Sequence, residues 1–139
     1  MVKQLVIWLF FRLLLALVPI AAEGMRLLTN GVVNPFGSAI ERGELLLIST
    51  ALCGGSMGIL ISALLGATAP TPEPLQIERA VALGAAFIVF AVSSLHYTNI
   101  AASYRAAPAA VNVSSVKKSS FYLFLAGVVS SAACVALGV

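Results

Sequence analysis

Apolar residues in this chain are gathered into four long runs, and only short polar stretches separate them. The runs cover residues 2–22, 45–66, 80–102 and 120–139. Each run is close to the ~20 residues that a helix needs to cross the hydrocarbon core of a bilayer. The pattern predicts an all-α fold, an integral membrane four-helix bundle that forms a single transmembrane domain over residues 1–139. The lipid bilayer is therefore the first partner that the sequence implies.

The polar stretches contain residues that commonly begin and end helices. Asn30 and Gly31 follow the first run, and both residue types are frequent helix stops. Ser38 and Glu41 have the spacing of a capping box, so the second helix is expected to begin there. The third helix is expected to start after Pro74 and to stop before Pro108, and the fourth to be capped by Ser114 or Ser115.

Composition agrees with the membrane interpretation. Hydrophobic residues make up 60% of the chain and charged residues 9%, whereas a soluble domain carries about 25% charged residues. The net charge of +3 does not indicate nucleic-acid binding, because the cations are scattered through the loops. Cations in membrane proteins usually determine which side a loop faces.

The distribution of these cations predicts an orientation. The first and third loops share one side and contain five cations, whereas Lys3 and Arg79 lie on the other side. The positive-inside rule then places loops one and three in the cytoplasm and both termini outside. The five cations are Arg26, Arg42, Arg105, Lys117 and Lys118.

Small residues recur at helical spacing in two of the runs. Such ribbons let membrane helices approach closely, where van der Waals contact drives association. We expect the second and fourth helices to pack at the centre, or alternatively to form a seam between subunits, and much of the first helix to face lipid. The candidate packing residues are Gly54, Gly58, Ser62 and Gly66 in the second run, and Gly127, Ser131 and Cys134 in the fourth.

Arg12 is the strongest candidate for a functional residue, because it lies midway along the first apolar run. A charge there costs about 2.5–3.5 kcal/mol even on the lenient insertion scale, so its side chain should face protein or water. Three interpretations remain open: a structural hydrogen bond to a neighbouring helix, a cationic ring around a pore in an oligomer, or a contact with a lipid phosphate.

A polar patch near the end of the third run provides further candidates. His96, Asn99 and Ser103 share a helical face and could line an aqueous vestibule. A lone histidine with no nearby metal-ligating residue does not predict a metal site. The alternative is a hydrogen-bonded helix end at the membrane interface.

The residues that are missing narrow the function further. The chain has no aspartate, and its five glutamates fall in loops or at helix ends, whereas proton-coupled transporters usually keep a carboxylate within the membrane. No catalytic motif is present, so we expect no catalytic residues, no metal and no cofactor.

Three functions follow from this set of residues. The first is a self-assembling pore, channel or membrane-perturbing effector, whose near-minimal loops fit a bacterial inner-membrane protein controlled by a separate partner. The second is a non-catalytic accessory subunit that braces other membrane chains. The third is a transporter or membrane enzyme with a site shared between subunits. The sequence favours the first.

Overall fold

The computed structural model describes 43–67 and 72–138 continuously, and before them the positions 10, 14, 18, 21, 22, 25, 26, 28–31, 33, 37, 40 and 41. All regular secondary structure in this part is helical: α3 (Glu44–Leu65), α4 (Glu73–Ala106), the 3-10 helix η1 (Pro108–Ala110) and α5 (Val113–Gly138). The predicted all-α fold is confirmed for three helices. Of the first predicted helix, over 2–22, only positions 10, 14, 18, 21 and 22 are described, and Arg12 lies outside the described residues.

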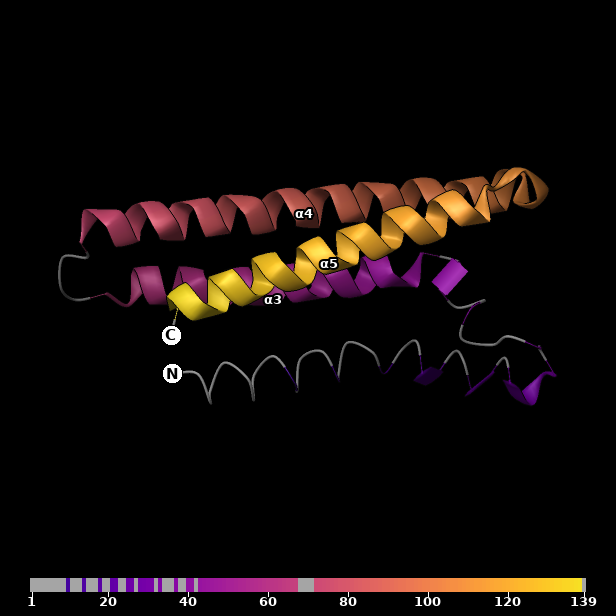
Figure 1. The fold of residues 1–139 in the computed structure, drawn as a ribbon, viewed down its shortest axis with the longest axis horizontal. Coiled ribbons are helices and arrows are strands. Elements are labelled where there is room, and N and C mark those ends of the chain that lie inside the picture. The colour runs from indigo at the N-terminus through magenta and orange to yellow at the C-terminus, as the bar shows by residue number, and fades with distance from the viewer. Residues whose placement is uncertain are drawn as a thin grey trace.

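The three long helices form one elongated bundle (Figure 1). α3 and α5 run in the same direction and pack along each other, and α4 runs antiparallel to both. The predicted pairing of the second and fourth apolar runs is therefore present. At about 1.5 Å per residue, the 34 residues of α4 extend about 51 Å, which exceeds the ~30 Å hydrocarbon core. One or both ends of α4 must project beyond it.

Two glycines in the left-handed region set the chain path before α3. Gly31 has a φ of 75°, and its N–H donates to the carbonyl of Leu28 at 3.1 Å, as expected for the end of a helix. Gly43 has a φ of 81° and directly precedes α3. The helix begins at Glu44, later than the start expected near Ser38, because the left-handed turn at Gly43 interrupts any continuous helix.

Prolines bound α4 at both ends. The helix starts at Glu73, one residue before Pro74, because a proline in the first turn lacks only an N–H that has no partner within the helix. It ends at Ala106, before Pro108, as the sequence predicts.

The start of α5 corrects the predicted cap. Asn112, rather than Ser114 or Ser115, caps the helix, because the N–H of Ser115 donates to Asn112 Oδ1 at 3.1 Å. An asparagine before the first turn is among the best N-caps, since its side chain satisfies an N–H that lacks a helical partner.

Small polar side chains hold the three helices together at the centre of the bundle. Ser49 Oγ donates to the carbonyl of Leu123 at 2.9 Å, and Ser131 Oγ donates to the carbonyl of Leu52 at 3.1 Å. Ser93 Oγ donates to Ser49 Oγ at 3.2 Å and so links α4 to the contact between α3 and α5. These hydrogen bonds cross between helices where close backbone approach makes them possible.

Serine and cysteine share this interior with large apolar side chains. Five serines are fully buried, and of these Ser120 has no hydrogen-bond partner among the described residues. Leucines contribute at both ends of the interior through Leu46 and Leu60, which are also fully buried. The fully buried serines and cysteines are Ser49, Ser56, Ser93, Ser120, Ser131, Cys53 and Cys134.

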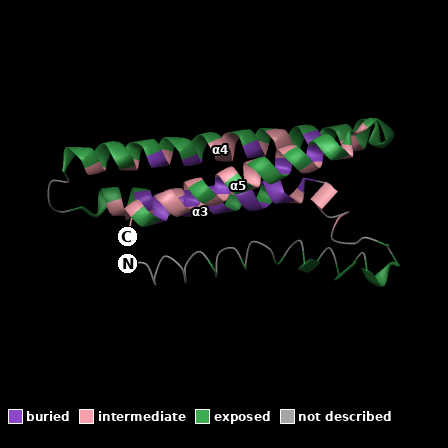
Figure 2. Ribbon diagram, viewed as in Figure 1, coloured by how far each residue is buried: buried purple, intermediate pink, exposed green. Residues whose placement is uncertain are grey.

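Much of α4 is exposed (Figure 2), and large apolar side chains are among the exposed residues of all three helices. Only 17% of the spanning segment of α4 is buried, against 44% for α3. Phe87, Ile88 and Leu95 are each at least 60% exposed. A bilayer requires an apolar exterior and polar side chains that are hydrogen-bonded inside the protein, because lipid cannot form hydrogen bonds with exposed polar groups.

Hydroxyl side chains on the outer surface are compatible with lipid, because their own helices satisfy them. Ser62 Oγ donates to the carbonyl of Gly58 at 2.8 Å, and Thr98 Oγ1 donates to the carbonyl of Leu95 at 2.8 Å. All three helices are long and apolar enough to cross a membrane. The chain is thus an integral membrane protein with transmembrane helices.

Candidate functional site

The predicted small residues of α5 lie where this helix meets α3. Gly127, Ser131 and Cys134 are all buried. A Cβ atom added to Gly127 would overlap Ser49 Oγ and lie 3.3 Å from Ser49 Cα. An alanine here would require the Ser49 hydroxyl to rotate and α3 to shift slightly, and a larger side chain would push α3 away.

The predicted small residues of α3 lie mostly outside this contact. A Cβ on Gly54 would rest 3.6 Å from the ring of Phe90, whereas a Cβ on Gly58 would have no described atom within 4 Å. Ser62 and Gly66 are exposed. The face of α3 that does meet α5 consists of Ser49, Cys53, Ser56 and Leu60, which sequence reasoning missed. Their i, i+4, i+7, i+11 spacing was the available signal.

The polar candidates of α4 come together at one corner of the bundle. His96, Asn99 and Ser103 line a groove of about 460 Å³ where α4 gives way to η1 and α5. Asn112, which caps α5, and Ser115 in its first turn complete the polar lining. We call the part of the bundle where α4 ends and α5 begins the clasp end.

A hydrogen bond fixes His96 beside this groove. Its Nε2 lies 2.7 Å from Ser119 Oγ, which is also 2.9 Å from the carbonyl of Ser115. The hydroxyl has one proton, so when Ser119 donates to Ser115, His96 must donate through Nε2. In the described part of the chain no three His, Cys, Asp or Glu residues are grouped to hold a metal ion. The groove offers hydrogen-bonding groups to a polar ligand.

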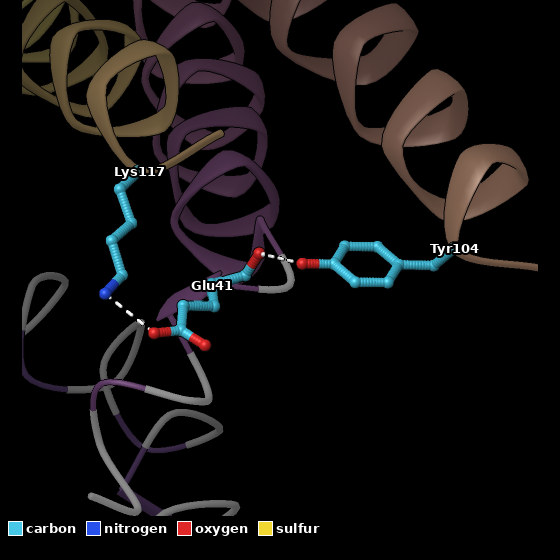
Figure 3. Close-up of polar contacts among 3 residues, drawn as sticks. All are labelled: Glu41, Tyr104 and Lys117. Carbon is cyan, nitrogen blue, oxygen red and sulfur yellow. Dashed lines mark hydrogen bonds and ion pairs between the residues drawn. The ribbon is translucent and has the colours of Figure 1, made fainter. Parts of the chain in front are cut away.

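Three residues from separate segments are joined at the clasp end (Figure 3). Lys117 Nζ lies 2.7 Å from Glu41 Oε1, and the Tyr104 hydroxyl donates to the backbone carbonyl of Glu41 at 2.9 Å. We call Glu41, Tyr104 and Lys117 the polar clasp. It connects the segment before α3 to the end of α4 and the start of α5. Because the side chains of Lys117 and Glu41 are 43% and 33% exposed, solvent weakens the ion pair, and the clasp serves mainly to position these segments.

Directly beside the clasp lies a second groove, of about 420 Å³. Two lysines line its edge nearest the start of α5, which we call the rim, and its other lining residues are largely apolar. We call it the basic groove; its lining residues are Gly37, Ile40, Leu45, Lys117, Lys118, Phe121 and Tyr122. The sequence singled out Lys117 and Lys118 only as determinants of orientation, and nothing in it indicated that they line one groove with Ile40 and Leu45.

The opposite end of the bundle has different chemistry. Arg79 Nε donates to the carbonyl of Leu137 at 2.9 Å. A guanidinium at this position satisfies a carbonyl near the C-terminus of α5 and complements the negative end of the helix dipole. The groove there, of about 440 Å³, is lined mainly by Ala, Val, Ile and Leu. The groove at this end therefore presents fewer hydrogen-bonding side chains than the groove lined by His96, Asn99 and Ser103.

Comparisons with protein-family models, with curated proteins and with solved structures found no match. The function must be argued from the geometry described above: a filled helical interior, an apolar exterior and a polar clasp end.

Proposed function

We propose that this chain is a non-catalytic membrane protein that self-assembles, and that the assembly opens a pore or otherwise perturbs the bilayer under the control of a separate partner. The observation that supports self-assembly is the open apolar surface around two glycines. A Cβ placed at Gly58 of α3 or at Gly84 of α4 meets no described atom within 4 Å. A helix of another subunit can approach the backbone closely at such positions.

A conducting path would run between subunits rather than through one of them. The interior of the three described helices is filled by fully buried side chains, which leaves no continuous passage there. The groove lined by His96, Asn99 and Ser103 would lie at the mouth of such a path. Arg12, which lies outside the described residues, would contribute a cationic ring in this arrangement, as its position in the sequence suggests.

We further propose that the clasp end faces the cytoplasm of a bacterial inner membrane. Arg105, Lys117 and Lys118 all lie at this end, whereas Arg79 lies at the other, and an excess of cations marks the cytoplasmic side. Alkaline phosphatase fused after Val139 should then be active, because the enzyme folds only outside the cytoplasm. An active fusion placed at Asn112 instead would reverse the orientation.

Self-assembly is tested by Gly58→Leu. We expect the wild-type chain in mild detergent to give one discrete homo-oligomer by native mass spectrometry and to release ions from liposomes. The leucine should reduce both by tenfold or more, because its side chain would hold the neighbouring helix away. Helicity should be unchanged, since the described part of the subunit leaves open space at this position.

A matched control is Ala51→Leu, at another exposed position of α3. This variant should leave assembly intact if the helix of the other subunit approaches the backbone of α3 at Gly58. A monodisperse monomer without conductance would contradict the proposal. Co-purification of a monomer with other membrane chains would instead support an accessory subunit.

A further inference from the structure

We propose that the basic groove binds an anionic phospholipid, with the phosphate between the lysines and an acyl chain running down α5. This inference does not depend on self-assembly, because all the residues that carry it belong to one subunit. It commits to a membrane lipid, since the groove is lined by Phe121 and Tyr122, which are exposed on the outside of α5.

The charge at the rim is suited to a phosphate. Lys117 is already paired with Glu41, so the uncompensated positive charge comes from Lys118, which is exposed and has no ion-pair partner among the described residues. Both lysines lie in the second turn of α5, next to each other along the chain. A basic pocket at the end of membrane helices is a common site for anionic headgroups.

The walls below the rim are suited to the glycerol and upper acyl region. Phe121 and Tyr122 follow the lysines by one helical turn and are 51% and 69% exposed. Their rings meet edge to face at a centroid distance of 6.4 Å. Aromatic rings concentrate at this depth of a bilayer, between the headgroups and the hydrocarbon. The order of groups along α5 therefore matches the order of groups along a phospholipid.

An exposed apolar track continues from the groove into the membrane. Phe121, Leu125 and Val129 are spaced four residues apart, so they share one face of α5, and they are 51%, 43% and 68% exposed. An acyl chain leaving the groove can follow this face. Free phosphate would gain nothing from the track, which is why the groove favours a lipid over a soluble anion.

The test compares lipid retention by the full chain in native mass spectrometry, with phosphatidylglycerol and phosphatidylcholine of identical acyl chains added in equal amounts. We expect the wild-type protein to retain phosphatidylglycerol preferentially. Lys118→Gln should reduce this preference about fivefold, the effect of one lysine near an anionic surface. Lys118 lies outside the polar clasp, so circular dichroism should show an unchanged fold.

Two further variants separate the headgroup from the chain. Arg105→Gln removes an exposed cation at the same end of the bundle, outside the groove, and should leave the preference unchanged. Phe121→Ala should weaken retention of both lipids equally. An unchanged preference in Lys118→Gln, or an equal loss in Arg105→Gln, would overturn the proposal. Displacement of the lipid by millimolar inorganic phosphate would overturn it as well, since the site would then recognise phosphate alone.

Discussion

Gly127→Leu should separate α5 from α3 and cause the largest loss of stability of any single substitution in the described bundle. A Cβ alone would already overlap Ser49 Oγ and press on the Ser49 backbone. Overpacking usually costs about 1–3 kcal/mol, and we expect this change to reach or exceed the upper value. The helices must move apart, which also weakens the hydrogen bond from Ser49 to Leu123. Titration with SDS in mixed micelles, followed by circular dichroism, measures the loss.

The matched control for Gly127 is Gly84→Leu on α4. Both are helical glycines in apolar surroundings, but a Cβ at Gly84 meets no described atom within 4 Å. The unfolding midpoint of Gly84→Leu should therefore stay near that of the wild type under monomeric conditions. Equal destabilisation by the two leucines would show that the α3–α5 contact is not as described.

Leu60→Ala should produce the second-largest effect. Leu60 is fully buried and packs with Ala82, Ala86 and Cys134 where all three helices meet. Removing its side chain leaves a cavity among atoms that cannot easily close it. Such substitutions cost about 2–5 kcal/mol in soluble proteins. We expect about 2–3 kcal/mol here, because in lipid the loss is mainly one of van der Waals contact. The same SDS titration measures it.

Leu65→Ala is the control within the same helix. Leu65 is 83% exposed, so its side chain exchanges contacts with lipid or detergent rather than with protein. Its replacement should change stability by no more than about 0.5 kcal/mol. A large effect at Leu65 and a small one at Leu60 would mean that α3 is rotated relative to its described orientation.

The positions of the three described helices could be predicted because long apolar runs leave little choice in a bilayer. The runs 45–66, 80–102 and 120–139 correspond to α3, α4 and α5, which begin up to seven residues earlier. The extra turns of α4 and α5 are polar enough to escape a hydropathy argument, yet they carry Tyr104 and Lys117 of the polar clasp.

The contact face of α3 could not be predicted with the same certainty. Small residues follow helical spacing on two faces of this helix: Gly54, Gly58 and Ser62 on one, and Ser49, Cys53 and Ser56 on the other. A helix that is apolar on all sides has no polar face to indicate which side is buried. Which side of α3 is buried depends on the partner helix α5, because Ser49 donates to the carbonyl of Leu123 and lies against Gly127.

The candidate site, too, could be predicted from the sequence only in part. The shared face of His96, Asn99 and Ser103 followed from spacing alone, and these residues do line one groove. The ion pair between Glu41 and Lys117 joins segments far apart in the chain. No local pattern identifies such a pair.

The order of the helices has a consequence for biosynthesis. The hydroxyls of Ser49 and Ser131 link α3 to α5, which begins at Val113, after the whole of α4 has been made. During membrane insertion α3 and α4 are therefore present before α5. Until α5 is made, the Ser49 hydroxyl cannot donate to the carbonyl of Leu123. If translation pauses after α4 and before α5, the bundle is incomplete. Chaperones or other newly inserted chains could then bind the exposed face of α3.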